Sequence, residues 1–374
     1  MEWNANGLLP LEWYKKMRRD SPVVQSNDGQ VWDVYGYDDV KTVFTNHDIF
    51  SSSAFPDSED PLEHSILRQD PPKHRQLRRL VTQAFTPRVI ESLAPKIQSI
   101  TTSLLDEAEK KGRMDAIADF ASPLPIVVIA EMLGVSLDHR EQFKAWSDAL
   151  VGDSGEAFYQ CQREMSEYFS EIAEDRRRHP QDDLVTKLVE ARIDNEHLTD
   201  LEIIGFCILL LVAGNETTTN LITSAMLGID SLPDVRAQLL ADRSLIPGAL
   251  EEVFRYFSPV QVMFRRVKQD TVLGGQEMKV GQFVHIWMAS ANHDEKVFER
   301  PEEFNIHRNP NPHLGLGSGI HYCLGSQLAR LESKIAIETL LARFPEYRRD
   351  RSAELARMDS MMMFALKELP IILT

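Results

Sequence analysis

The chain has 374 residues, and 43% of them are hydrophobic, which is enough for a substantial core. With 57 acidic and 41 basic side chains, the net charge of −16 argues against general nucleic-acid binding and against adhesion to anionic membranes. The three cysteines, Cys161, Cys207 and Cys323, are too few for a disulfide scaffold and indicate a reducing compartment.

No targeting or membrane-spanning segment is expected. The first residues, 1–6, lack the basic start and apolar run of a signal peptide. The longest apolar run, residues 203–213, is shorter than the ~18 residues that a membrane span needs. The sequence therefore predicts a cytoplasmic protein that does not insert into a membrane.

Residues 1–250 have mostly helical patterning. A short helix over residues 9–20 precedes two strand-like segments, 23–24 and 31–35, which flank a hairpin signal at 27–29. Residues 50–72 are polar and irregular, as in loops that carry function. Further helices are expected over residues 73–85, 125–133, 138–150, 156–178 and 182–191.

A long helix dominates the second half of the chain. Thr199 and Glu202 have the spacing of a capping box, and apolar residues continue to about Leu232, so this helix spans on the order of 50 Å. Another helix begins at Ile246 and ends at Ser258, before a proline. Strands are then expected over residues 260–264, 271–273 and 283–288.

These elements predict one mainly helical domain, residues 1–374, with a small β region, because no repeat or low-complexity linker divides the chain. We expect the helical body at about 70–258 and 324–345, and β-rich parts at about 20–36, 260–290 and 350–374.

A glycine-dense loop, residues 313–325, delivers Cys323 to the start of the last helix. A helix N-terminus favours a thiolate, which serves as a metal ligand or a nucleophile. A zinc site would need four ligands at recognisable spacings, and only His321 lies close. The loop alone leaves open a nucleophilic cysteine, a haem thiolate and an inert buried cysteine.

The long helix is interrupted halfway by the polar segment 213–220. Gly214 costs ~1 kcal/mol relative to Ala in a helix, and a buried Glu216 costs more unless it is paired. Ala213 and Gly214 allow a close approach to the backbone, and Glu216 and Thr217 offer an acid and an alcohol for relaying protons. The alternative is a plain polar face between two buried stretches.

Two further pairs are weaker indications. Glu252 and Arg255 are spaced to pair on one helix face, which is common in exposed helices. His74 and Arg78 share a face that suits an anion such as a carboxylate. Arg75 and Arg79 lie on an adjacent face, either as a basic docking patch or as a solvated face that balances local charge.

In this order, the four motifs resemble those of the cytochrome P450 superfamily of haem-thiolate monooxygenases, of the soluble bacterial or archaeal type. Gly319, Cys323 and Gly325 match the family's haem-binding signature, with Leu316 where Phe is usual. Segment 213–217 is similar to the family's oxygen-activation motif, and Glu252 with Arg255 matches its E-x-x-R motif. Residues 301–304 and Arg308 resemble the meander that follows that motif. Residues 70–78 resemble the helix that binds the haem propionates.

The resemblance implies a fold in which the long helix crosses haem b, with Cys323 as the axial thiolate ligand. It implies catalytic roles for Gly214, Glu216 and Thr217, and a structural network of Glu252, Arg255 and Arg308. The cofactor-binding residues that it implies are His74, Arg78, Arg265 (or else Arg266), His321, Ala213, Leu316, Gly317 and Gly325.

The resemblance also implies insertion of one oxygen atom of O2 into a C–H bond of a medium-sized apolar substrate, such as a fatty acid, terpenoid or steroid. The predicted pocket consists of the 50–67 loop, Leu209, Leu210, Ala213, Val262, Met263, Met362 and Met363, although the Met residues would suit ordinary core packing equally well. Electrons would come from a separate ferredoxin or flavodoxin with its reductase, docked on Arg75 and Arg79 of a monomer. The alternatives are a peroxide-driven haem-thiolate enzyme and a non-catalytic haem sensor.

Overall fold

The computed structural model describes residues 7–26, 29–55, 58–151, 155–193 and 196–374, so most of the predicted 27–29 turn lies outside it. The helices are α1 Leu11–Asp20, α2 Tyr37–Thr45, α3 Pro61–His64, α4 Lys73–Thr82, α5 Pro87–Ser92, α6 Ala94–Lys111, α7 Pro123–Leu133, α8 Arg140–Val151, α9 Gly155–Arg178, α10 Leu184–Glu190, α11 Asp200–Ser231, α12 Pro233–Ala241, α13 Ile246–Tyr256, α14 Met288–Ala291 and α15 Ser326–Arg343. The strands are β1 Val23–Ser26, β2 Val31–Val34, β3 Phe50–Ser51, β4 Arg113–Asp115, β5 Arg192–Ile193, β6 Glu196–His197, β7 Val262–Val267, β8 Thr271–Leu273, β9 Gln276–Met278, β10 Phe283–Trp287, β11 Arg348–Arg349 and β12 Pro370–Ile372. The predicted class, mainly α with a small β region, is confirmed.

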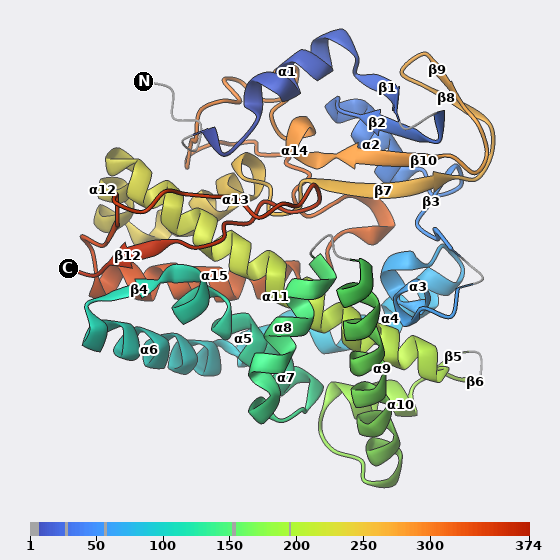
Figure 1. Ribbon diagram of the computed structural model, residues 1–374, viewed down its shortest axis with the longest axis horizontal. Coiled ribbons are helices and arrows are strands. Elements are labelled where there is room, and N and C mark those ends of the chain that lie inside the picture. Colours follow the sequence, from blue (N-terminus) through green and yellow to red (C-terminus); the bar gives the residue numbers. More distant parts are fainter. Residues whose placement is uncertain (1–6, 27–28, 56–57, 152–154, 194–195) are drawn as a thin grey trace.

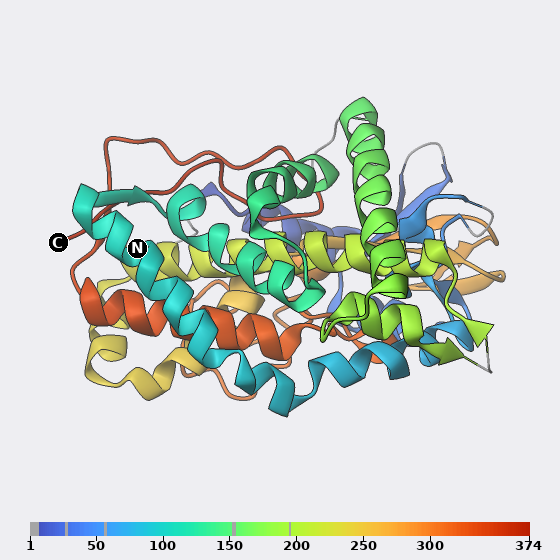
Figure 2. The ribbon, with the colours of Figure 1, turned by 90° about the horizontal axis from the view of Figure 1, so that it is seen from below.

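Helix α11 crosses the molecule and forms the centre of its core (Figure 1). Its capping box is formed as predicted: Thr199 Oγ1 accepts the N–H of Glu202 at 3.3 Å, and Glu202 accepts the N–H of Thr199 at 2.8 Å. Most of its residues are buried on both sides of the polar segment. Figure 2 shows α15 running alongside α11, and the two helices are in contact.

Two helical stretches, Ala116–Leu133 and Asp200–Ser231, are long and apolar enough to cross a membrane. Most of each stretch is buried inside the protein, and α7 packs directly against α11. Their apolar composition is therefore accounted for by the core that they form.

The main sheet lies along one edge of the molecule, at the top of Figure 1, in the order β1-β2-β10-β7-β3. Strand β10 runs parallel to β2 and antiparallel to β7. Helix α13 packs against α11, and β7 begins six residues after the end of α13. Strand β7 therefore lies near the polar segment of α11. Of the parts predicted as β-rich, 20–36 supplies β1 and β2 and 260–290 supplies β7 and β10, whereas β8 and β9 pair with each other in a separate two-stranded sheet.

Two regions differ from the predictions. The tail over residues 350–374 contains only β12 and two isolated bridges, Val260–Met363 and Arg357–Leu366, so it is less regular than predicted. The 50–72 loop contains β3, α3 and a 3₁₀ turn. Asp60 caps α3 by accepting the N–H of Leu62 at 2.8 Å, and Pro61 follows it, which is a helix-start signal that the sequence reasoning overlooked.

Candidate active site

A cavity of about 280 Å³ lies where α4, α11, β7 and residues 313–325, called the cysteine loop from here on, meet. It brings together most of the residues predicted for the site, although they come from four distant parts of the chain. The predicted residues that line it are His74, Arg78, Leu209, Leu210, Ala213, Gly214, Thr217, Met263, Arg265, Leu316, Gly317, His321, Cys323 and Gly325.

Cys323 lies two residues before Gly325, the N-cap of α15, and its N–H donates to the carbonyl of Leu316 at 2.9 Å. Burial raises the pKa of the Cys323 thiol, although the N–H of Gly325 acts in the opposite direction. The helix start therefore favours the thiolate, as expected from sequence, but this effect does not offset the burial of the sulfur. A cation bound at the sulfur would favour it, because a coordinating thiol loses its proton.

Four cationic or donor side chains gather in one part of the cavity: His74 and Arg78 from α4, Arg265 from β7 and His321 from the loop. Burial and Arg78 lower the pKa of His74 to about 4, and burial and Arg265 lower that of His321 to about 2. Both ring nitrogens of His74 and Nε2 of His321 are buried without a hydrogen-bond partner among the described residues. This cluster therefore needs an anionic ligand, such as a pair of carboxylates.

The alternation of β7 explains which arginine takes part. Successive strand residues point to opposite faces, so Met263 and Arg265 line the cavity. Arg266 instead donates to the carbonyl of Ala54 at 3.0 Å. Burial and Arg68 lower the pKa of Arg265 to about 10, which again indicates a site built for an opposite charge.

The cysteine loop presents bare backbone to the cavity. A Cβ at Gly325 would meet no protein atom within 4 Å, so that side of the loop faces open space. A Cβ at Gly315 would lie 2.5 Å from the carbonyl oxygen of Phe254, so the loop can pack on α13 only with glycine there. A flat macrocycle with two carboxylates fits these features: bare backbone around a cysteine sulfur and, at one edge, two arginines beside histidine nitrogens that have no hydrogen-bond partner among the described residues. The residues present therefore fit haem b with Cys323 as its axial ligand.

The opposite wall is the polar segment of α11. Ala213, Gly214, Thr217 and Thr218 line the cavity, and Thr217 Oγ1 donates to the carbonyl of Ala213 at 2.6 Å. A Cβ at Gly214 would lie 2.8 Å from Cδ1 of Ile129. Gly214 therefore permits close packing of α7 against α11, besides lining the cavity.

Glu216 is not among the residues that line the cavity. Its Oε1 accepts from Ser147 Oγ at 3.1 Å and from Asn215 Nδ2 at 3.3 Å. Helix α8, which carries Ser147, therefore holds the acid on the side of α11 next to Thr217. The carboxylate of Glu216 therefore does not line the cavity itself, unlike the hydroxyl of Thr217 beside it in the chain.

The predicted structural network is fully formed and buried. Glu252 and Arg255 are both 0% exposed and make a bidentate pair at 2.7 and 2.8 Å, while Arg308 Nε lies 3.3 Å from Glu252. Arg255 also donates to the carbonyls of Asn292 and Pro301. Since each charge is compensated by hydrogen bonds, this network can stay buried and hold the meander under the cysteine loop.

Three predicted pocket residues lie elsewhere. Val262 points away from the cavity, because it has the opposite phase to Met263 in β7. Met362 is exposed, and Met363 is buried in the tail, where its backbone bridges Val260. The apolar wall is completed by residues that were not predicted individually: Ile66, Leu67, Ile129, Phe206, Pro259, Val260 and Met288.

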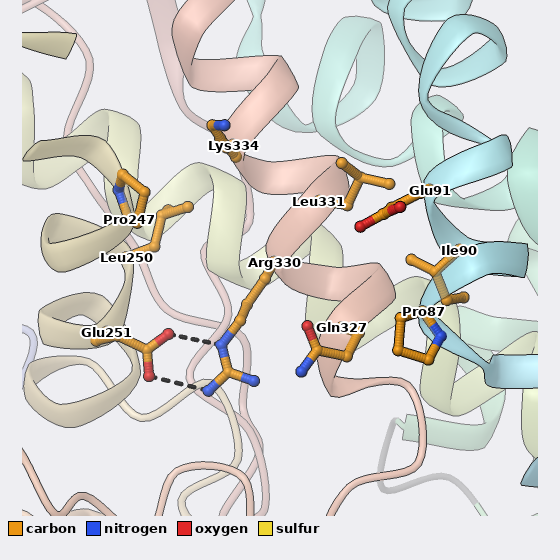
Figure 3. Close-up of a pocket in the computed structure, with 10 residues that line it drawn as sticks. All are labelled: Pro87, Ile90, Glu91, Pro247, Leu250, Glu251, Gln327, Arg330, Leu331 and Lys334. Carbon is orange, nitrogen blue, oxygen red and sulfur yellow. Dashed lines mark hydrogen bonds and ion pairs between the residues drawn. The ribbon is translucent and has the colours of Figure 1, made fainter. Parts of the chain in front are cut away.

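Sequence reasoning also missed two acidic groups near the loop. Burial raises the pKa of Glu332, which lines the cavity from α15, to about 8, and its Oε1 has no hydrogen-bond partner in the described chain. Glu251 lines a separate surface pocket of about 220 Å³ between α5, α13 and α15 (Figure 3). Burial acts to raise the pKa of Glu251, but hydrogen bonds from Arg330 and His313 outweigh this effect and lower the pKa to about 2.

Comparisons with known proteins agree with this geometry. The family model for cytochrome P450 matches residues 11–141 and 137–374. A protein of Bacillus subtilis (strain 168) named putative cytochrome P450 YjiB is 45% identical over 347 residues, which cover 90% of this chain and 87% of that protein. The crystal structure of CYP109E1 from Bacillus megaterium in complex with testosterone has a TM-score of 0.94 and 41% identity, with 98% of both chains covered.

A second crystal structure, P450BioI in complex with an acyl carrier protein ligated to hexadec-9Z-enoic acid, has a TM-score of 0.91 and 35% identity, with 98% of both chains covered. These matches span almost the whole chain, and they confirm the resemblance found from the four motifs. The chain therefore belongs to the cytochrome P450 family of haem-thiolate monooxygenases.

Proposed function

We propose that this monooxygenase inserts one oxygen atom of O2 into a C–H bond of a medium-sized, uncharged apolar substrate. The observation that carries the substrate class is the composition of the cavity wall. Among the described residues that line the wall, the titratable side chains outside the cluster of His74, Arg78, Arg265 and His321 are Cys323 and Glu332. A substrate carboxylate would therefore be buried without a free cationic partner. Burying an unpaired charge in this way costs on the order of several kcal/mol of binding free energy.

Steroid-like and terpenoid-like molecules suit this wall better than free fatty acids do. The complex of CYP109E1 with testosterone supports a steroid-like substrate. The acyl-carrier complex of P450BioI makes a long acyl chain the second candidate. Met263 and Met288, which are flexible and polarisable, allow the wall to adapt to either shape.

The chain's own residues have distinct roles in this proposal. Haem, when bound, supplies the iron at which O2 is activated, with electron donation from the thiolate. Cys323 would hold the iron, and His74, Arg78, Arg265 and His321 would orient the macrocycle by hydrogen bonds to its carboxylates. Thr217 Oγ1 holds a proton at the cavity wall, and Glu216 replenishes it through water from the side of α8.

A matched pair of ligands tests the substrate class. We expect methyl hexadecanoate to bind at least about tenfold more tightly than free hexadecanoate, because only the acid buries a charge. Binding is measured by the spin-state change in the haem absorption spectrum, with testosterone as a rigid neutral reference. Equal or tighter binding of the free acid would contradict an uncharged substrate class.

We also propose a separate ferredoxin or flavodoxin, with its reductase, as electron donor to a monomeric cytoplasmic enzyme. Arg75 and Arg79 are exposed on α4, and neither forms an ion pair with a residue that the structure describes. They can therefore attract an acidic carrier at low salt. The double variant Arg75→Glu/Arg79→Glu should slow transfer of the first electron at low ionic strength. The control variant Arg113→Glu, which changes an exposed arginine on β4, should not. Equal rates in the unmodified enzyme, the double variant and the control would refute docking at α4.

A further inference from the structure

His313, at the start of the cysteine loop, is held from two sides. Its Nε2 lies 3.0 Å from Glu251 Oε2, and its Nδ1 accepts the N–H of Gly315 at 3.2 Å. Since Nδ1 accepts from an amide, Nε2 carries the hydrogen that is donated to the carboxylate, which fixes one neutral tautomer. The ring also stacks on Phe254 of α13, with centroids 5.6 Å apart and an interplanar angle of 16°.

This contact continues to the axial cysteine. Gly315 is pressed against α13, and the next residue, Leu316, accepts the N–H of Cys323 through its carbonyl at 2.9 Å. One path therefore links Glu251 to the backbone of Cys323. It runs by hydrogen bonds from Glu251 through His313 to Gly315, along the chain to Leu316, and by a hydrogen bond from there to Cys323.

A second connection reaches Cys323 from its other side. Arg330 of α15 binds Glu251 through Nε at 2.7 Å and Nη2 at 2.9 Å, as the dashed lines in Figure 3 show. Arg330 also donates to the carbonyl of Ser326, the first residue of α15 and three residues after Cys323, at 3.5 Å. Both connections meet at one carboxylate, which is 32% exposed and lines the surface pocket, outside the buried network of Glu252 and Arg255.

We propose that Glu251 is a positioning residue for the haem thiolate: through His313 and Arg330 it fixes the cysteine loop in the conformation that ligates iron. The proposal rests on haem-thiolate ligation by Cys323. It extends that assignment by placing control of the loop at a surface-accessible carboxylate. His313 acts as the transmitting group, because its ring is the only described side chain that contacts both Glu251 and the N–H of Gly315.

Two variants and a matched control test this role in the haem-loaded enzyme. His313→Phe keeps an uncharged ring stacked on Phe254 but removes the hydrogen bonds to Glu251 and to the N–H of Gly315. Glu251→Gln keeps the shape of the side chain and removes the charge. Glu91→Gln removes a charge from the same pocket, where the side chain of Glu91 has no hydrogen bond or ion pair within the described residues.

The first readout is amide hydrogen exchange in residues 313–323, which does not depend on turnover. We expect exchange at Gly315 to be about fivefold faster in His313→Phe, which removes the acceptor of that N–H. In Glu251→Gln, where His313 remains but is held less firmly, exchange should be faster by a smaller factor. The second readout is the reduced, carbon monoxide-bound spectrum, in which both variants should lose part of the strongly red-shifted Soret band at unchanged haem content.

Glu91→Gln should match the unmodified enzyme in both readouts. If His313→Phe and Glu251→Gln also match it, Glu251 does not position the loop, and the proposal is wrong while haem-thiolate ligation stands. If the unmodified enzyme itself lacks the red-shifted band, haem-thiolate ligation fails and the proposal fails with it.

Discussion

The rings of His74 and His321 lie with their centroids 4.2 Å apart, although one belongs to α4 and the other to the cysteine loop. Burial lowers the pKa of both, so the two rings can pack together as neutral groups. Arg78 and Arg265 line the cavity beside them. The contact thus joins two distant segments into one corner of the cavity, and its donors suit the carboxylates of haem.

Arg78 should contribute to haem retention, whereas its exposed neighbour should not. Replacing Arg78 by Gln removes a charge-assisted hydrogen bond worth roughly 1.5–3 kcal/mol, so haem should dissociate about tenfold or more faster. Arg79→Gln is the control, because Arg79 lies on the exposed face of α4. Haem loss is measured by transfer to a haem-free acceptor protein, and equal rates for the two variants would show that Arg78 does not bind a propionate.

The hydroxyl of Thr217 should couple electron transfer to product formation. Thr217→Val keeps the shape of the side chain but removes the proton-carrying oxygen, so product per reducing equivalent should fall by about tenfold or more while peroxide accumulates. Thr217→Ser keeps the hydroxyl and should stay close to the unmodified enzyme. Product and peroxide are measured per NAD(P)H consumed; full coupling in Thr217→Val would exclude this role.

The sequence predicted those features that local patterns encode. Thr199 and Glu202 mark the start of α11 because a capping box is a contact within one helical turn. The four motifs together, namely the cysteine loop, the polar segment, the Glu252–Arg255 pair and the His74–Arg78 pair, indicated a haem-thiolate protein by their resemblance to one family. The choice of Arg265 over Arg266 depended on the strand phase, which the motifs do not determine.

The features that were missed or misplaced depend on tertiary packing. The Glu251–His313–Arg330 cluster joins α13, the cysteine loop and α15, so no sequence window contains it. Val262 was misplaced because a strand of apolar residues does not reveal which face meets the cavity. Glu332 occurs in a helix of mixed polarity, and only the packing of α15 against α11 shows that its carboxyl is buried.

Met263 should influence substrate selection, whereas Met362 should not. Met263→Phe places a larger side chain in the cavity wall, so the affinity for testosterone relative to methyl hexadecanoate should change several-fold, as expected for a shape change worth about 1–3 kcal/mol. Met362→Phe alters an exposed residue and is the control. Spectral titrations with both ligands measure the ratio; a change only in Met362→Phe would place the substrate elsewhere.

Glu332 should make the stability of the enzyme depend on pH. Burial raises the pKa of this carboxyl from 4.5 to about 8, so the folded protein holds the proton more tightly than the unfolded chain does. The tighter binding of the Glu332 proton in the folded state adds to the free energy of unfolding. This stabilisation is fully present below pH 4.5 and is lost as the pH rises toward about 8, by up to about 1.4 kcal/mol per pH unit.

Glu332→Gln removes this titration, so the variant should gain stability relative to the unmodified enzyme as the pH rises, and the difference should level off above about pH 8. Urea unfolding at a series of pH values measures it. A stability difference that does not change with pH would mean that Glu332 is ionised in the folded enzyme.

The most direct measurement of the haem-thiolate assignment is the absorption spectrum of the reduced enzyme with carbon monoxide bound. We predict a strongly red-shifted Soret band in the unmodified enzyme and its loss in Cys323→His, which can still bind haem iron but supplies no thiolate. Purified protein that holds no haem, or a spectrum that Cys323→Ser leaves unchanged, would contradict ligation by Cys323.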